Sequence, residues 1–289
     1  MQVVEARPAV NCASSTPASR HGELASVIQS YWNNRSDTYS NGVLAELEGD
    51  QLGAWIGLFS ERLGAPALTG EVPGTASTGA DTPKRVLDIG CGPGFFEVVL
   101  SRLGHEVLAV DSSQAMLDTA GVNVLECGSS ELVAFMQGDA ESLALEDESF
   151  DVVVSRNVTW LMQHPRQAYR EWKRVLRPGG RLLVFDANWY RYLVDEEVNC
   201  QRKLDQEDVA TLGWSESERA TSEQEIACES IALHLPLTRE DRPSWDRAVL
   251  RQLGFSSVSV DEEAWQSLWA PGEKAFYATS PLFMIEAVK

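Results

Sequence analysis

The chain has 289 residues, of which 44% are hydrophobic and 23% are charged, so it is able to bury a sizeable core. Its formal net charge is −19, which disfavours binding to nucleic-acid phosphates and to anionic membranes. The sequence holds neither an apolar run of the ~20 residues that span a membrane nor the basic start and apolar centre of a secretory signal. These features predict a cytoplasmic protein whose partner is neither nucleic acid nor a membrane.

The N-terminal region divides into an arm and a helical cap. Residues 1–20 are rich in Ala, Ser and Pro and show no periodicity, which predicts a flexible arm. Residues 21–83 predict a helical cap and linker, because two stretches carry apolar residues at one-face spacing. The second of these stretches covers residues 43–63, and the residues after it are dense in Gly, Pro and Thr, as is typical of an exposed linker.

Residues 84–189 alternate short apolar strands with helical patterns, which predicts βαβ units and a mostly parallel sheet. Two of the predicted helices end at glycines, Gly104 and Gly121, and a third runs from Pro165 to Val175. The five strand patterns are RVLDIG, HEVLAVD, VAFMQGD, FDVVVS and RLLVFDA.

The strands then stop until the C-terminal region. Residues 190–241 contain two amphipathic helical patterns, and we expect this insertion to lie as a lid over the carboxyl edge of the sheet. A dimerisation element or a passive surface decoration is the alternative. Residues 242–289 predict a last helix, which ends at Gly254, and two strands that complete the core.

The five cysteines are scattered, and no two of them form a C-x-x-C pair. This pattern favours neither a disulfide framework nor a zinc site, so no metal is predicted. A reducing compartment fits such usage best. The residues are Cys12, Cys91, Cys127, Cys200 and Cys228.

Three glycines lie between the first strand and the helix that follows it, within VLDIGCGPGFF. Gly90, Gly92 and Gly94 allow the backbone to turn tightly and to approach a ligand closely. Phe95 stands where the dinucleotide-binding fingerprint G-x-G-x-x-G has its third glycine, which disfavours a nicotinamide-dependent oxidoreductase. Cys91 provides only a small side chain in this loop.

Carboxylates close the next two strands. Asp111 ends the second strand about twenty residues after the glycines, where it is able to accept hydrogen bonds from both hydroxyls of a ribose. Asp139 ends the third strand, where its carboxylate suits an adenine amino group and Ala140 leaves room for the ring. Met116 is placed to pack on the adenine. Each aspartate alone is better explained as a helix cap or turn residue, but their succession predicts a nucleoside site.

These motifs together resemble the successive motifs of the class I methyltransferases that use S-adenosylmethionine (SAM), in particular the small-molecule type with a methyltransferase domain of the 11/25 kind. The likeness runs through VLDIGCGPGFF, LAVDSS, GDAESLALEDESFDVVVS and RVLRPGGRLLVFDA, over roughly residues 84–187. It implies an α/β fold with a Rossmann-like, seven-stranded, mostly parallel sheet, helices on both faces, N-terminal helices and a helical lid insertion.

The resemblance also implies a role for each matching residue. Residues around the glycine loop would shape the pocket for the methionine end of SAM, and the strand-end aspartates would hold its ribose and adenine. The YWNNRSDTYS segment resembles the helix that folds over the cofactor in small-molecule relatives. The implied cofactor-binding residues are Tyr31, Arg35, Tyr39, Asp88, Gly90, Cys91, Gly92, Asp111, Ser112, Met116, Asp139, Ala140, Arg156 and Asn157.

The catalytic residues are not identified by the sequence. Many small-molecule relatives have a His where this chain has Trp160, which is unable to act as a base. His164 and Asp186 are the remaining candidates for a base, although His164 precedes a proline at a helix start and suits a capping or surface role. Trp160, Asn188 and Trp189 are predicted to contact the acceptor.

The leading hypothesis is therefore an enzyme that transfers a methyl group from SAM to a small molecule, with S-adenosylhomocysteine as its product. A protein or tRNA methyltransferase is the first alternative, and the acidic charge disfavours RNA. A SAM-binding module without catalysis is the second alternative.

Overall fold

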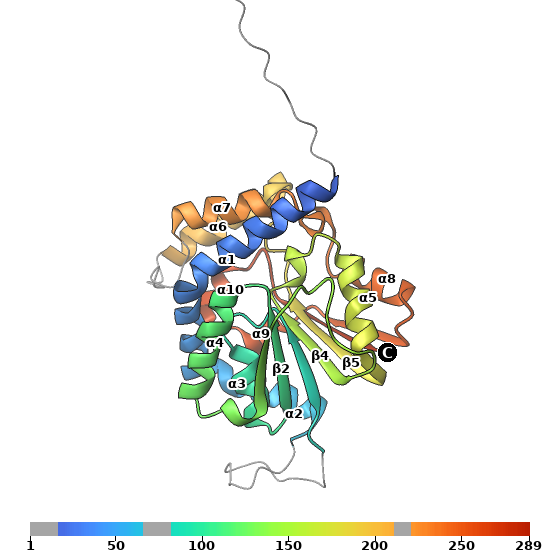
Figure 1. The fold of residues 1–289 in the computed structure, drawn as a ribbon. Helices are drawn as coiled ribbons and strands as arrows, with labels where there is room; N and C mark the ends of the chain where they lie inside the picture. The colour runs from blue at the N-terminus through green and yellow to red at the C-terminus, as the bar shows by residue number, and fades with distance from the viewer. Residues whose placement is uncertain (1–16, 66–81, 211–220) are drawn as a thin grey trace, which may run out of the picture.

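The computed structural model describes residues 17–65, 82–210 and 221–289 (Figure 1). Seven strands form one sheet in the order β3-β2-β1-β4-β5-β7-β6, which confirms the predicted sheet. Their bounds are Arg85–Ile89 (β1), Glu106–Asp111 (β2), Val133–Gln137 (β3), Phe150–Arg156 (β4), Leu176–Asp186 (β5), Ser257–Asp261 (β6) and Phe283–Val288 (β7).

The strand order favours a ligand site at the carboxyl ends of the central strands β1 and β4. The first five strands are parallel, and β7 runs antiparallel to both β5 and β6. The chain leaves β1 toward β2 and β3, and then crosses back to β4 and β5 on the other side of β1. In open α/β sheets, ligands bind outside the carboxyl ends of the strands at such a reversal.

Helices cover both faces of the sheet, and alternate strand residues point to each face. Val86, Val152 and Phe185 face a core built with α2 and α3, whereas Leu87 and Val153 face a core built with α5 and α8. The period of two along each strand explains this division. The helices are α2 (Gln51–Leu63), α3 (Phe95–Arg102), α4 (Gln114–Glu126), α5 (Pro165–Val175) and α8 (Ser244–Gln252).

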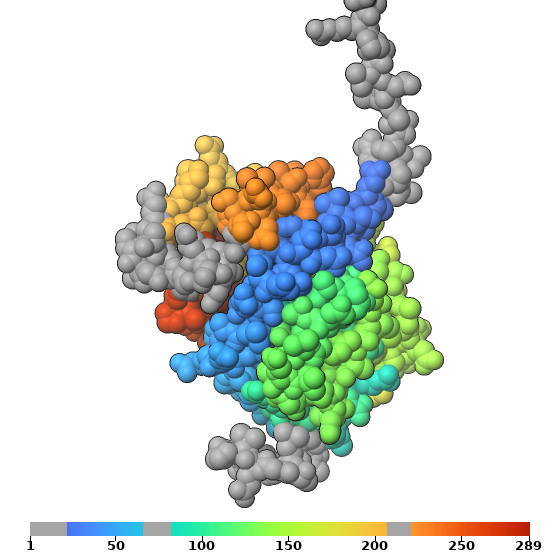
Figure 2. Space-filling view, turned by 60° about the vertical axis from the view of Figure 1, so that its left-hand side comes forward, coloured from blue at the N-terminus to red at the C-terminus, as the bar shows by residue number. Residues whose placement is uncertain are grey.

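Three further helices gather at one end of the sheet (Figure 1). They are the long α1 (Pro17–Glu48) and the two helices of the insertion, α6 (Glu196–Ala210) and α7 (Ser222–Ala232). Buried Cys228, Ile231 and Ala232 of α7 pack in one apolar cluster with Ile28 and Trp32 of α1. Figure 2 shows α1 lying between α7 and α4 on this face of the molecule.

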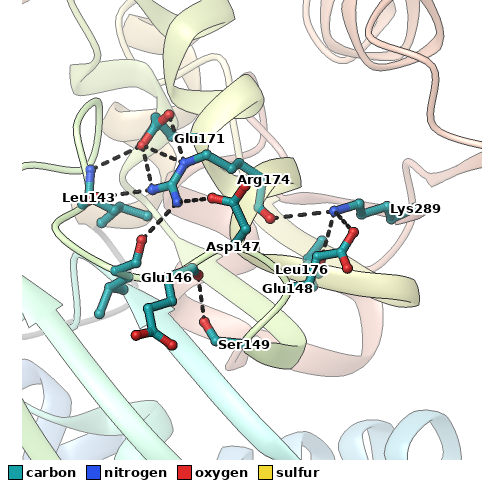
Figure 3. A network of polar contacts seen from close by, with 10 residues as sticks. Leu143, Glu146, Asp147, Glu148, Ser149, Glu171, Arg174, Leu176 and Lys289 are labelled. Atoms are coloured by element: carbon teal, nitrogen blue, oxygen red, sulfur yellow. Dashed lines mark hydrogen bonds and ion pairs between the residues drawn. The ribbon is translucent and has the colours of Figure 1, made fainter.

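A charged network fixes the loop between β3 and β4 to the C-terminal part of α5 (Figure 3). Arg174 donates to the carbonyl oxygens of Leu143 (3.0 Å) and Leu145 (2.7 Å) and pairs with Asp147 (2.7 Å) and Glu171 (2.9 Å). Glu171 comes from the same helix as Arg174, one turn earlier. This network holds the loop that begins with the predicted adenine residues.

Several predicted boundaries differ from the structure. Helix α1 begins at Pro17, so it takes in the end of the predicted arm, and residues 1–16 lie outside the described residues. The pattern at 43–63 is divided at Gly49, between α1 and α2. The predicted stop at Gly121 is wrong, because α4 continues to Glu126. Nothing lies within 4 Å of a Cβ at Gly121, so the glycine is simply accommodated on an open helix face.

The remaining short elements connect the larger ones. Two helices between β6 and β7, α9 (Trp265–Leu268) and α10 (Pro271–Phe276), have no counterpart in the prediction. The other short helices are η1 (Ser130–Leu132), η2 (Thr159–Leu161), η3 (Arg191–Leu193) and η5 (Pro236–Arg239). The predicted linker lies mostly at 66–81, outside the described residues. Among the helices that the structure describes, we find none with the length and apolar character of a membrane span.

Candidate functional site

The glycine loop turns sharply between β1 and α3. Gly90 has φ 69°, and a Cβ there would lie 2.3 Å from Cγ2 of Val158, so both its backbone and its surroundings require glycine. The Gly90 amide donates to the carbonyl of Val110 at 2.7 Å, which fixes the loop to the end of β2. The loop therefore presents backbone rather than side chains to the carboxyl edge.

Asp111 connects this loop to the start of α4. Its Oδ2 accepts from the Gly92 amide at 3.0 Å, and its Oδ1 accepts from the Ser113 amide at 2.8 Å. Burial raises the pKa of the Asp111 carboxyl, whereas the hydrogen bonds from Ser113 and Gly92 oppose that shift. Each oxygen keeps a further lone pair, so the carboxylate is able to accept from hydroxyls of a ligand.

A cavity of about 510 Å³ lies beside Asp111 at the strand ends, and we call it the strand-end cavity. Its size falls within the range of small-molecule sites. Ten of the predicted cofactor residues line it: Tyr39, Gly90, Gly92, Asp111, Ser112, Met116, Asp139, Ala140, Arg156 and Asn157.

Helix α1 forms the roof of the strand-end cavity. Ile28, Gln29 and Trp32 line it from above. The Gln29 amide donates to the carbonyl of Ser112 at 2.6 Å, and the Ser113 hydroxyl donates to Oδ1 of Asn33 at 2.7 Å. These bonds join the roof to the start of α4, and so the N-terminal helix closes over the predicted nucleoside site.

A second cavity of about 440 Å³ lies under the insertion, and we call it the lid cavity. Predicted residues Tyr31, Arg35, Trp160 and Trp189 line it. Its wall also includes Tyr190 and Tyr192, as well as residues that have no role in the sequence prediction. Those residues are mostly aromatic or charged, and include Glu46, Trp55, Arg202, Glu225, Glu229, Trp269, Glu273, Phe276 and Tyr277.

The two cavities meet where Trp32, Tyr39, Arg156 and Asn157 line both of them. The Arg156 guanidinium pairs with both carboxylate oxygens of Glu46, at 2.6 and 3.2 Å. Asn157 is held with φ 59°, in the left-handed region that asparagine tolerates better than most residues. We call these four residues the junction.

Some buried polar atoms of these linings have no hydrogen-bond partner in the described part of the chain. They include Nε1 of Trp32, Nε of Arg35 and Oδ1 of Asn157. The Arg35 guanidinium donates to two neutral groups, Thr38 Oγ1 at 2.9 Å and Gln224 Oε1 at 3.2 Å. Because unpaired buried polar groups are costly, a bound ligand is the natural partner for these atoms.

Asp186, a candidate base, is fully buried and fully bonded. Its Oδ2 accepts from the Trp160 amide at 3.1 Å and pairs with Arg242 at 2.8 Å, and its Oδ1 accepts from the Trp189 indole at 2.8 Å. It lines neither cavity. This geometry favours a positioning role, in which Asp186 holds two tryptophans of the lid cavity.

The other candidate base, His164, lies at the start of α5. Its Nδ1 is 2.7 Å from Glu141, and the side chain is 45% exposed. His164 is outside the linings of both cavities, as is Asn188, whose amide donates to the carbonyl of Arg242 at 2.7 Å. The described geometry therefore supports neither residue as a group that contacts ligand.

Neither Asp88 nor Cys91 lines a cavity, although Cys91 belongs to the glycine loop. Both are buried, and burial raises the pKa of the Cys91 thiol, which argues against a nucleophilic role. Asp88 lies beside Glu97 of α3, and burial raises the pKa of Asp88 to about 7. Glu97 is fully buried, and burial together with the adjoining Asp88 carboxyl raises the pKa of Glu97 well above the usual range.

This buried pair predicts a pH-dependent stability. Because the pKa of Glu97 is raised in the folded state, the folded chain binds the Glu97 proton more tightly than the unfolded chain does. The resulting contribution to the free energy of unfolding is complete below about pH 4 and is lost as pH rises toward the folded-state pKa. A glutamine cannot ionise, so the Glu97→Gln variant does not lose this stability. We expect its advantage in the free energy of unfolding over wild type to grow by about 1.4 kcal/mol per pH unit above about pH 5.

Urea denaturation at pH 5, 6, 7 and 8 measures this difference, and Glu106→Gln, at an exposed position, provides the control. A difference between Glu97→Gln and wild type that stays constant with pH would show that Glu97 ionises normally.

Comparisons with known proteins agree with this geometry. Residues 87–184 match the family model described as "Methyltransferase domain". The chain is 36% identical over 149 residues to an uncharacterized methyltransferase, YcgJ, of Bacillus subtilis, which covers 51% of this chain and 58% of the relative. It is 40% identical over 116 residues to the ubiquinone/menaquinone biosynthesis C-methyltransferase UbiE of Pseudomonas paraeruginosa, covering 38% of this chain and 44% of the relative.

A malonyl-[acyl-carrier protein] O-methyltransferase of Paenibacillus is 38% identical over 111 residues, or 37% of this chain and 40% of the relative. The chain thus spans about half the length of the curated relatives it matches.

Solved structures share the fold. A putative SAM-dependent methyltransferase from Methanococcus maripaludis superposes with a TM-score of 0.53 at 17% identity, covering 87% of this chain and 91% of that one. The structure of YcgJ from Bacillus subtilis gives a TM-score of 0.50 at 22% identity, covering 82% and 98%. Residues 87–184 therefore form a methyltransferase domain, within a chain that has the predicted sheet, glycine loop and strand-end aspartates.

Proposed function

We propose that this protein transfers the methyl group of SAM to a small-molecule acceptor. The observation that carries the proposal is the junction, because it joins a nucleoside-sized cavity at the glycine loop to a second cavity under the insertion. Adenosine occupies the strand-end cavity, and the acceptor occupies the lid cavity.

The residues of the chain fit SAM group by group. Asp111 accepts from the ribose hydroxyls, and Asp139 accepts from the adenine amino group. Arg35 has no carboxylate within ion-pair distance among the described residues, so it suits the methionine carboxylate, and its Nε is one of the unpartnered atoms. SAM supplies an activated methyl group when bound, so the protein mainly has to orient the acceptor and exclude water, which is able to contribute about 7–11 kcal/mol.

The insertion at 190–241 serves as the lid in this proposal. Tyr190, Tyr192, Arg202, Glu225 and Glu229 bring its elements to the wall of the lid cavity. Gln224 of α7 also bonds to Arg35 of α1, which joins the lid to the cofactor roof. The insertion therefore connects acceptor binding with cofactor binding.

Removal of the Asp111 carboxylate tests the cofactor site. Asp111→Ala deletes charge-assisted bonds worth about 1.5–3 kcal/mol each, so SAM affinity measured by calorimetry should fall at least roughly tenfold. Asp118→Ala, an exposed aspartate on the same side of the sheet, is the matched control and should bind SAM normally. Unchanged SAM affinity in a folded Asp111→Ala protein would show that Asp111 only caps the start of α4 and does not bind the cofactor.

Conversion of SAM to S-adenosylhomocysteine in the presence of candidate acceptors tests the activity itself. SAM binding without turnover for any acceptor would favour the non-catalytic module. Preferential binding of NAD over SAM would overturn the whole proposal.

Nucleic acid is not the substrate in this proposal, because the chain carries a formal net charge of −19. Gel-shift titration with tRNA and with duplex DNA at moderate salt should show no binding. Tight binding that weakens steeply with salt would contradict this expectation.

A further inference from the structure

One wall of the lid cavity is aromatic. Trp189 follows β5, whereas Trp269 and Tyr277 come from the segment between β6 and β7. Their ring centroids are 6.1 Å (Trp189–Trp269), 5.3 Å (Trp189–Tyr277) and 5.6 Å (Trp269–Tyr277) apart. Aromatic faces of this kind attract organic cations such as alkylammonium groups.

A carboxylate lies in the same wall. Glu273 of α10 accepts through Oε2 from the Gln51 amide at 2.6 Å and from the Ala270 amide at 2.8 Å. Burial and the neighbouring charge of Glu46 raise the pKa of Glu273 to about 7, and Arg156 opposes this shift. Glu273 thus interacts with the Arg156–Glu46 pair at the junction, and it suits a group that exchanges a proton near neutral pH.

The balance of charge in the lid cavity also favours a cation. Four carboxylates line it, against three guanidinium groups, Arg35, Arg156 and Arg202. Arg156 is neutralised by Glu46, and Arg202 lies 3.9 Å from the ring centroid of Tyr192. The carboxylates are Glu46, Glu225, Glu229 and Glu273.

At the junction, Oδ1 of Asn157 is a buried acceptor that has no partner among the described residues. It needs a hydrogen-bond donor, and an acceptor molecule with an N–H or O–H group provides one. A carboxylate or thioether acceptor has no such donor. The junction therefore favours an acceptor molecule that presents a hydrogen-bond donor.

From these features we infer that the acceptor is an amine, held by the aromatic wall of Trp189, Trp269 and Tyr277 and by Glu273, with its N–H directed to Oδ1 of Asn157. This inference rests on the proposed methyl transfer. The incoming ammonium gives one proton to the Glu273 carboxylate. The nitrogen lone pair then forms the N–C bond as the C–S bond breaks, and its electron pair stays on sulfur, which leaves a methylated ammonium and S-adenosylhomocysteine.

The cation site is tested with choline and its neutral isostere 3,3-dimethylbutan-1-ol, added to the full chain saturated with S-adenosylhomocysteine. Tryptophan fluorescence should report saturable choline binding at least roughly tenfold tighter than that of the isostere. Glu273→Gln should weaken choline binding roughly tenfold and leave the isostere unchanged. Glu263→Gln, an exposed glutamate before α9, is the matched control.

Equal binding of the two probes, or no saturable binding of either, overturns the inference. A protein that binds neither SAM nor S-adenosylhomocysteine in calorimetry instead overturns the proposed function, so the two failures are distinguishable.

Turnover separates the acceptor atoms. Phenethylamine and 2-phenylethanol have the same shape, and we expect methylation, followed by mass spectrometry, of the amine alone. Asn157→Gly keeps the left-handed backbone but deletes the acceptor oxygen, so amine methylation should fall at least roughly tenfold, whereas Asn157→Asp keeps an oxygen and should retain more activity. Methylation of the alcohol in preference to the amine, or an unaffected Asn157→Gly enzyme, contradicts the inference.

Discussion

Replacement of Asp186 by alanine should lower the free energy of unfolding by about 3–5 kcal/mol, because it removes one of the two carboxylates that pair with a buried guanidinium. Arg242 is 1% exposed, and it lies between Asp186 at 2.8 Å and Asp246 at 2.9 Å. Tyr169 donates to Asp246 at 2.5 Å, so this buried network includes a second helix of the same face. Equilibrium urea denaturation measures the loss.

An exposed ion pair between α8 and the residue after β6 provides the matched control. Arg247 and Glu262 are 3.8 Å apart and 40% and 67% exposed, so Glu262→Ala should change the free energy of unfolding by about 0–1 kcal/mol. Asp186→Asn keeps the acceptor for Trp189, and its loss of stability should fall between those of Asp186→Ala and Glu262→Ala. A fully stable Asp186→Ala protein would show that Asp246 alone suffices for Arg242, and the positioning role of Asp186 would then have no energetic basis.

The strand ends explain why the cofactor half of the site was predictable from sequence. Gly90 and Asp111 belong to segments whose strand pattern and turn residues are local, and parallel pairing brings the ends of β1 and β2 together. Because the strands were predicted to be mostly parallel, their carboxyl ends were expected at the same end of the sheet, which brings Asp111, Asp139 and the glycine loop together. Local chemistry and parallel pairing therefore contain most of the candidate nucleoside site.

The acceptor half depends on tertiary packing that leaves no local pattern. Glu273 and Tyr277 come from the segment between β6 and β7, and nothing in their spacing signals that this segment builds a cavity together with α1 and the insertion. The pairing of Glu46 with Arg156 joins positions 110 residues apart. The PGEK segment, with Pro at the start of α10 and Glu at its third position, is a local signal from which a helix start could have been predicted, but it does not place the helix at the cavity.

Asp186 shows how a correct pattern suggested an unsupported role. It does end β5, where a carboxylate is often exposed to ligand. Its burial depends on Arg242, 56 residues later in the sequence, and on the indole of Trp189, whose rotamer no pattern predicts. The strand pattern thus predicted the position of the Asp186 carboxyl at the end of β5, but not the Arg242 and Trp189 side chains that bond to it.

Replacement of residues 195–235 by a Gly-Ser linker should abolish methyl transfer while SAM still binds. Asp111, Asp139 and the glycine loop are untouched by this change, so calorimetric SAM affinity should stay within about tenfold of wild type despite the lost Gln224–Arg35 bond. Turnover should fall at least roughly 100-fold, because the acceptor loses both its wall and its protection from water. Turnover at the wild-type rate would show that the insertion is a dimerisation element or a surface decoration.

A pair of point variants on α7 tests the same lid without deleting it. Ile231 is 3% exposed in the cluster beneath α7, whereas Ile226 on the same helix is 66% exposed. Ile231→Ser should loosen the lid from α1, because truncating a buried isoleucine costs about 2–5 kcal/mol, and turnover should fall with little change in SAM affinity. Ile226→Ser should leave both unchanged. If the two variants turn over equally well, the packing of α7 on α1 does not control the acceptor site.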